Sequence, residues 1–172
     1  MSPKRVCLAM SGGVDSATAA LLLRRQGYEV HGVTLRLRSG DDRSGLCGSE
    51  DDITLARKLA ASMGIEHTVL DLCQLFRDTV MKQFTDEYVR GRTPNPCVDC
   101  NREIKFGALM DWALDHGMDA MATGHYARVE YHGETGRWRL LRGLDRRKDQ
   151  TYFLFQVTQA QLARLLLPVG GY

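Results

Sequence analysis

Short apolar runs alternate with helix-length amphipathic segments along most of the chain. Four runs have the length and composition of buried strands, at residues 5–10, 28–37, 67–72 and 119–123. Three segments between them carry apolar residues at helical spacing, at residues 17–25, 51–63 and about 104–116. Because strands alternate with helices, the pattern predicts a mostly parallel sheet covered by helices.

Two further patterns complete the predicted fold. Phe76, Val80, Phe84 and Tyr88 recur at intervals of four, which predicts a helix whose apolar stripe packs in the core. Residues 127–131 and 138–141 flank the sequence HGETGR, which predicts a β-hairpin. The glycine-rich segment 40–50 is expected to be a loop near the ligand end of the sheet. We therefore expect a doubly wound, Rossmann-like α/β fold with a short C-terminal hairpin, forming one domain over residues 1–172.

Composition narrows the class of protein. The 172 residues are 44% hydrophobic and 26% charged, which is ordinary for a globular domain. No apolar run approaches the roughly 20 residues of a membrane-spanning helix, and no signal peptide is evident, so we expect a cytoplasmic location without membrane contact. The net charge of +2 is too small to indicate nucleic-acid binding by itself. One strongly basic segment, 137–148, is either a solvated hairpin face or a contact for nucleic acid.

The chain contains five cysteines, an odd number that argues against a disulfide framework. Cys7 lies in a predicted strand and Cys73 follows another, so both are expected in or near the core. Cys47, Cys97 and Cys100 lie in loop-like surroundings, where a thiol can react or bind metal.

A glycine turn follows the first predicted strand and precedes the first helix. Its residues lie at the carboxyl end of a strand, where open α/β sheets bind ligands, and they are Met10, Ser11, Gly12, Gly13, Val14, Asp15 and Ser16. Backbone N–H groups and the helix N-terminus can hold a polyphosphate there, with hydroxyl donors from Ser11 and Ser16. A carboxylate beside phosphates is unfavourable unless a cation lies between them, so Asp15 predicts bound Mg²⁺.

Two better-known phosphate motifs are absent: neither G-x-x-x-x-G-K-[ST] nor G-x-G-x-x-G occurs at this turn. The sequence SGGVDS instead resembles the signature of the ATP-pyrophosphatase, or PP-loop, superfamily. That resemblance implies an adenine nucleotide alpha hydrolase-like fold and cleavage of ATP between its α and β phosphates. The adenylate so formed turns an amide or urea oxygen into a good leaving group, but the superfamily alone does not identify the nucleophile.

A second segment carries thiols next to a predicted helix. Two prolines stiffen the sequence TPNPCVDCN, which leads into the helix expected to begin near Ile104. A thiol at a helix start is favoured as thiolate, and Arg102 and Lys105 add positive charge, so Cys100 is a candidate nucleophile.

Several motifs together are similar to the tRNA-specific 2-thiouridylase family, namely GRTPNP, CNREIKF, ATGHYAR and LLRGLDRRKDQTYFLF. In that family ATP adenylates the C2 oxygen of the wobble uridine of tRNA, and a cysteine persulfide supplies the sulfur that replaces it. The resemblance implies ATP contacts by Ala9, Met10, Ser11, Gly12, Gly13, Val14, Asp15, Ser16, Leu35 and Gly124.

The same resemblance implies roles in sulfur transfer and tRNA binding. Cys100 matches the family's first catalytic cysteine. The residues implied to contact the target base or the rest of the tRNA are Asn95, Pro96, Cys97, His125, Lys148, Asp149 and Gln150. The family's second catalytic cysteine and its C-terminal tRNA-binding domains have no counterpart within these 172 residues. We therefore expect a fragment that does not complete thiolation alone, and a separate persulfide-bearing donor protein.

Cys97 stands where some family members have aspartate, which creates a C-x-x-C pair with Cys100. Three interpretations remain open. A structural zinc site would need further ligands, such as Cys47 or His125. An iron–sulfur cluster could be held by Cys47, Cys97 and Cys100. In the simplest interpretation Cys100 is the nucleophile and Cys97 a neighbour that forms a disulfide with it under oxidation.

Two other functions compete with tRNA thiolation. An amide-forming ligase would share SGGVDS but would not need TPNP or Cys100. A non-catalytic ATP- or tRNA-binding module would bind the nucleotide and leave its phosphates intact. The sequence does not discriminate between oligomeric states.

Overall fold

The computed structural model of the chain describes residues 4–38 and 48–172. Its centre is a sheet whose neighbouring strands all pair in parallel. In spatial order the five strands are β3 (Glu66–Asp71), β2 (Glu29–Arg36), β1 (Arg5–Ala9), β4 (Ala120–Ala122) and β7 (Leu165–Leu166). Four of these strands were predicted from the apolar runs, and β7 was not, because a two-residue strand has no periodicity to detect.

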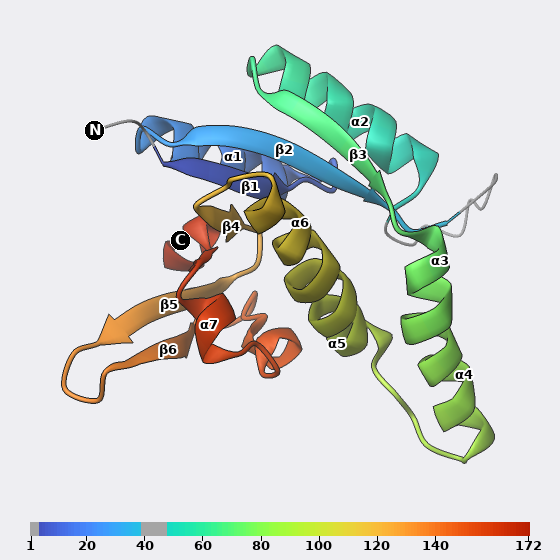
Figure 1. Cartoon of the computed structure of the whole chain (residues 1–172). Coiled ribbons are helices and arrows are strands. Elements are labelled where there is room, and N and C mark those ends of the chain that lie inside the picture. Colours follow the sequence, from blue (N-terminus) through green and yellow to red (C-terminus); the bar gives the residue numbers. More distant parts are fainter. Residues whose placement is uncertain (1–3, 39–47) are drawn as a thin grey trace.

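Helices cover both faces of this sheet (Figure 1). Alternate residues of β1 point to opposite faces: Val6 and Leu8 belong to the core beneath α1 (Val14–Arg25) and α2 (Glu50–Ser62), whereas Cys7 belongs to the core on the other face. All three side chains have no exposed surface. The doubly wound parallel fold is therefore confirmed.

The second face is covered mainly by one long helical segment. It consists of α5 (Pro96–Asp99), the π-helical stretch η2 (Cys100–Leu109) and α6 (Met110–Asp115), which follow one another without a break. The predicted start near Ile104 is wrong, because the helix already begins at Pro96. Proline suits the first helical position, and the side chain of Asn95 caps the helix by accepting a hydrogen bond from the N–H of Cys97 (3.1 Å).

A second helical segment leads away from β3 as α3 (Cys73–Phe76), the π-helical turn η1 (Arg77–Met81) and α4 (Lys82–Val89). The predicted stripe does lie on this helix, but it packs in the core only at its N-terminal end. Val80 is fully buried, whereas Tyr88 is 54% exposed and its ring contacts that of Phe84 at 4.9 Å. The far end of this helix projects from the sheet in Figure 1.

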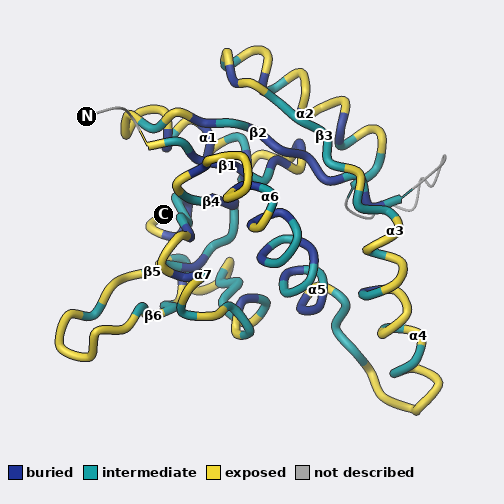
Figure 2. The backbone as a smooth tube through the Cα atoms, in the orientation of Figure 1, coloured by how far each residue is buried: buried dark blue, intermediate teal, exposed yellow. Residues whose placement is uncertain are grey.

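The predicted hairpin is present as β5 (Ala127–His132) and β6 (Arg137–Arg142), an antiparallel pair separate from the main sheet. Figure 2 shows that its tip is exposed, whereas the strands nearer the sheet are partly covered. Short elements that the sequence did not predict attach it to the rest of the molecule. They are η3 (Thr151–Leu154), α7 (Gln159–Leu162) and η4 (Pro168–Gly171).

Specific hydrogen bonds fix the hairpin in place. The N–H of Trp138 donates to Gln159 Oε1 (2.9 Å), and the N–H of Leu144 donates to the carbonyl of Gly170 (3.0 Å). Most of segment 40–50, predicted as a loop, lies outside the described residues. Within the described part of the chain, no helix is both long and apolar enough to cross a membrane.

Candidate functional site

A cavity of about 220 Å³ opens at the carboxyl ends of β1 and β4. The chain runs outward in opposite directions from these two neighbouring strands, to β2 on one side and to β7 on the other, which is where doubly wound sheets bind ligands. The described residues that line it are Ala9, Met10, Ser11, Asp15, Ser16, Val33, Thr34, Leu35, Leu37, Gly48, Asp52, Lys105, Thr123, Gly124, His125 and Gln150.

Seven of the ten predicted ATP contacts line this cavity: Ala9, Met10, Ser11, Asp15, Ser16, Leu35 and Gly124. The other three do not line the cavity: Gly12 and Gly13 form the turn, and Val14 is the first residue of α1. These contacts remain predictions, but the structure brings seven of them together from β1, β2 and the segment after β4.

The turn before α1 has the geometry of an anion-binding loop. Gly12 has a φ of 79°, a left-handed conformation that favours glycine. Gly13 precedes the helix without any side-chain cap, so the first N–H groups of α1 keep their hydrogen-bonding capacity for a ligand. Ser16 Oγ accepts from the N–H of Ser11 (3.3 Å) and donates to the carbonyl of Gly13 (2.9 Å), which holds the loop in shape.

Gly124 allows the strand end of β4 to approach this loop closely. A Cβ atom at this position would lie 2.9 Å from both the carbonyl carbon of Asp15 and the nitrogen of Ser16. A side chain larger than hydrogen would therefore push the two walls of the cavity apart. This contact gives a steric reason for glycine in the ATGHY motif.

Asp15 is held by residues beyond the loop. Its Oδ1 accepts a hydrogen bond from the hydroxyl of Tyr126 (2.8 Å), and Lys148 Nζ donates to the same tyrosine oxygen (3.1 Å). The ammonium of Lys148 also lies 4.6 Å from the centre of the Tyr126 ring. Lys148, predicted to face tRNA, is thus connected to the phosphate loop through Tyr126, which the sequence analysis did not identify.

The cavity contains a histidine that is uncharged at neutral pH. Burial, together with the positive charge of Lys105, lowers the pKa of His125 from 6.5 to about 3. Its Nδ1 lies 2.7 Å from Thr123 Oγ1. His125 was predicted to contact tRNA, and the structure places it in the wall of the cavity beside the predicted ATP contacts.

The other two residues of the predicted tRNA-contacting run differ from each other. Gln150 lines the cavity, and its Oε1 accepts from the N–H of Tyr126 (3.0 Å). Asp149 instead organises the backbone, since its Oδ1 accepts from the N–H of Gly143 (3.0 Å) and from the hydroxyl of Thr151. Burial raises the pKa of Asp149, but these hydrogen bonds outweigh it and leave the pKa below its usual value.

The candidate nucleophile lies on the long helix, not at its first residue. Asn95 and Pro96 form the helix start, Cys97 is exposed, and Cys100 is half-buried against the core in the second turn. Cys100 does not line the cavity, but Lys105, five residues later, does. Cys7 is a core thiol as expected, because burial raises its pKa to about 12.

A metal centre finds limited support. No three His, Cys, Asp or Glu side chains converge on a common point among residues 4–38 and 48–172. Cys47, which the iron–sulfur hypothesis needs, lies outside these ranges. Asp52 also lines the cavity, but its Oδ2 is occupied by the N–H groups of Gly48 (3.1 Å) and Ser49 (3.2 Å) at the start of α2. Asp15 as a carboxylate for Mg²⁺ stays a prediction from the sequence.

Seven residues that line the cavity were not predicted as part of this site: Val33, Thr34, Leu37, Gly48, Asp52, Lys105 and Thr123. Thr34 Oγ1 donates to the carbonyl of Met10 (2.8 Å), so it joins β2 to the phosphate loop. These residues come from distant segments and carry no local motif. Only the strand order, which places β1 between β2 and β4, brings them together.

The chain is similar in sequence to curated proteins. The chain is 53% identical over 175 aligned positions to the tRNA-specific 2-thiouridylase MnmA of Carboxydothermus hydrogenoformans, covering 98% of this chain and 48% of that protein. It is 49% identical to the protein of the same name from Pelotomaculum thermopropionicum, covering 100% of this chain and 48% of that protein. The chain thus spans about half the length of these relatives.

A solved structure shares the fold. It is described as a predicted subunit of tRNA methyltransferase from Methanocaldococcus jannaschii, and it matches 98% of this chain and 69% of its own length with a TM-score of 0.59 and 19% identity. A family profile described as "tRNA methyl transferase HUP domain" matches residues 4–172. With nearly the whole chain matched, this protein belongs to the tRNA methyl transferase HUP domain family.

Proposed function

We propose that this chain is the ATP-binding part of a tRNA-specific 2-thiouridylase. The observation that carries the proposal is the cavity at the carboxyl ends of β1 and β4. Asp15, near the uncapped start of α1, and Lys105 both line this cavity. Lys105 lies one turn along the helix from Cys100. A nucleotide site next to a thiol is what ATP-dependent thiolation requires. Two relatives that share about half of their aligned residues with this chain are named tRNA-specific 2-thiouridylase, which supports the same reaction.

The proposed chemistry has two steps. The C2 oxygen of the uridine attacks the α-phosphorus of ATP, and pyrophosphate leaves with the electrons of the broken P–O bond. The terminal sulfur of a persulfide then attacks C2, and AMP leaves with the former carbonyl oxygen. The thiolate of Cys100 attacks the inner sulfur of the persulfide, which breaks the S–S bond, leaves the terminal sulfur on C2 and joins Cys100 to the donor cysteine in a disulfide. A donor protein would deliver the persulfide, and tRNA as substrate would place the reaction in the cytoplasm.

The residues divide between these steps. The loop from Ser11 to Ser16 binds the phosphates, and Asp15 shares Mg²⁺ with them. Cys100 serves the sulfur-transfer step, while Asn95, Pro96 and Cys97 at the helix start lie next to the target base. ATP with Mg²⁺ is sufficient for the activation step, and an iron–sulfur cluster on Cys47, Cys97 and Cys100 is not needed for it.

The basic surface fits a tRNA backbone. Five arginines of β6 and of the turn that follows it are exposed: Arg137, Arg139, Arg142, Arg146 and Arg147. They precede Lys148, which reaches Tyr126 at the phosphate loop. Positive side chains of this kind contribute sequence-independent affinity for phosphates.

Pyrophosphate release, measured with and without unmodified tRNA, tests the proposal. We expect release to depend on tRNA, to be lost in Asp15→Ala, and to persist in Cys100→Ser, because that thiol acts after adenylation. An amide-forming ligase would release pyrophosphate without tRNA when given an amine acceptor. Transfer of a methyl group from S-adenosylmethionine to tRNA, without use of ATP, would overturn the proposal in favour of methylation.

A further inference from the structure

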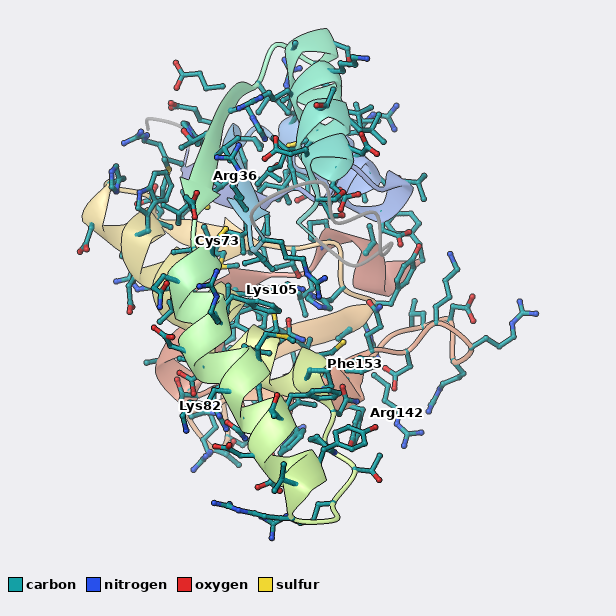
Figure 3. The ribbon with its side chains drawn as sticks, turned by 90° about the vertical axis from the view of Figure 1, so that its right-hand side faces the viewer. Arg36, Cys73, Lys82, Lys105, Arg142 and Phe153 are labelled. Atoms are coloured by element: carbon teal, nitrogen blue, oxygen red, sulfur yellow. The ribbon has the colours of Figure 1, made fainter. Side chains whose placement is uncertain are left out.

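Lys105 is the one lysine or arginine among the described residues that line the cavity. It lies in η2, and Figure 3 shows it near the end of the sheet, well above Lys82 of α4. Apolar residues of β2 and Leu37 form the part of the cavity wall where we expect adenine to bind. A single cation in a cavity lined by a phosphate loop is therefore available to a negatively charged ligand.

Other cations of the region already have protein partners. Lys82 pairs with Asp86 (2.9 Å), and Arg36 pairs with Glu50 (2.7 Å). Lys148 donates to Tyr126. By contrast, within residues 4–38 and 48–172 Lys105 makes neither a hydrogen bond nor an ion pair. Because a half-buried ammonium without a partner costs free energy, its position in the cavity indicates a ligand that supplies the missing charge.

The helix geometry places Lys105 on the same side as Cys100. In the π-helical stretch Cys100–Leu109 the backbone hydrogen bonds run from residue i to residue i+5. Residues five apart are therefore about one turn apart and share a side of the helix. In an ordinary α-helix, with 3.6 residues per turn, positions five apart would point in clearly different directions.

This arrangement identifies the phosphate. In the proposed reaction the atom attacked by the uridine oxygen is the α-phosphorus, and the same uridine must next meet the sulfur. Arg102 is closer to Cys100 in sequence, but it pairs with Asp99 and Glu103 and does not line the cavity. The cavity cation on the same side of the helix as the thiol is thus the one that can meet the reacting phosphate. The loop before α1 is left to hold the remaining phosphates.

We propose that Lys105 binds the α-phosphate of ATP. This role rests on the proposed function and adds a residue to it. When the uridine oxygen attacks and the bond to the β-phosphate breaks, the ammonium of Lys105 balances the charge on the non-bridging α oxygens. It continues to hold AMP while sulfur displaces it from C2.

Binding of AMP separates this role from a general effect on phosphate affinity, because AMP has only the α-phosphate. We would measure ATP and AMP binding to the 172-residue chain by calorimetry with Mg²⁺ present, in wild type and in Lys105→Met. Lost charge-assisted hydrogen bonds should weaken both ligands about 10-fold to 100-fold. Lys105→Arg, which keeps the charge, should recover part of the affinity.

Lys82→Met is the matched control, since it removes a lysine outside the cavity and should leave both affinities unchanged. Circular dichroism melting of each variant checks that the fold is retained. Equal AMP affinity in wild type and in a folded Lys105→Met would overturn the role of Lys105 and leave the proposed function standing. Failure of the wild-type chain to bind ATP would overturn both.

Discussion

At the residue scale, His125 makes the stability of the chain dependent on pH. Its pKa is lowered to about 3 in the folded state, against 6.5 for a free histidine, because burial disfavours its charged form. Between these values the unfolded chain binds the extra proton. The contribution of uncharged His125 to the free energy of unfolding is therefore complete above pH 6.5. It is lost progressively as the pH falls from 6.5 towards 3.

From these values we expect the free energy of unfolding to fall by up to about 2 kcal/mol between pH 7 and pH 5 because of His125. Burial also lowers the pKa of His67, which acts in the same direction. In His125→Gln the decrease should be clearly smaller. Urea denaturation at the two pH values measures it, and an equally steep decrease in the variant would contradict the prediction.

Single residues also show where sequence reasoning reaches its limit. Ser11, Asp15 and Gly124 were predicted to contact ATP because each belongs to a short motif, and all three line the cavity. Tyr126 could not, although its hydroxyl lies 2.8 Å from Asp15, because the two are 111 positions apart and their contact depends on the pairing of β1 with β4. The lowered pKa of His125 likewise depends on what surrounds it in the fold.

At the element scale, the start of the long helix is the feature that the sequence analysis placed incorrectly. The two prolines indicated a stiff loop, and the apolar spacing became clear only from Ile104 onward. The structure uses Pro96 as the first helical residue and Asn95 as its cap. Asparagine at the cap and proline at the first helical position are both preferred at helix starts, so the local sequence itself indicates a start at Pro96.

The cap can be tested directly. Asn95→Ala removes the acceptor for the N–H of Cys97 and should lower the free energy of unfolding by about 1 kcal/mol. Asn95→Asp should retain most of the stability, because aspartate caps equally well and its charge suits a helix start. Denaturant titration of the two variants compares them. A loss in Asn95→Asp as large as in Asn95→Ala would show that the cap is not what matters at this position.

At the scale of the whole molecule, the hairpin is joined to the sheet through the C-terminal turn η4. A Cβ atom at Gly170 would overlap the backbone of Ala127 at the start of β5, whereas one at Gly171 would meet nothing within 4 Å. Gly170 is also buried, whereas Gly171 is exposed. They form a matched pair of positions for testing how firmly the hairpin is attached.

Gly170→Ala should lower the free energy of unfolding by about 3 kcal/mol, because backbone must move to admit the methyl group. Gly171→Ala should change it by less than about 0.5 kcal/mol, as is usual at open surface positions. Thermal melting measures both. Equal melting temperatures for the two variants would mean that η4 yields easily and does not fix the hairpin.

The overall topology was predictable for a physical reason. The alternation of strands and helices can be recognised from the local spacing of hydrophobic residues. A parallel sheet follows from that alternation. The docking of the hairpin was not predictable, because it depends on Gly170 and on the short elements η3, α7 and η4, which are too short to show a periodicity. The hairpin itself was predicted, and its attachment was not.

Because the stretch Cys100–Leu109 is wound as a π-helix, the number of residues in it matters as much as their identity for which side chains share a side. Deleting one residue between Cys100 and Lys105 would let the backbone return to the ordinary i to i+4 pattern with its hydrogen bonds intact. In the shortened α-helix the sulfur and the ammonium would be four residues apart and would still share a side. A deletion here would therefore preserve the pairing of thiol and cation, whereas winding the full-length stretch as an ordinary α-helix would turn Lys105 away from Cys100.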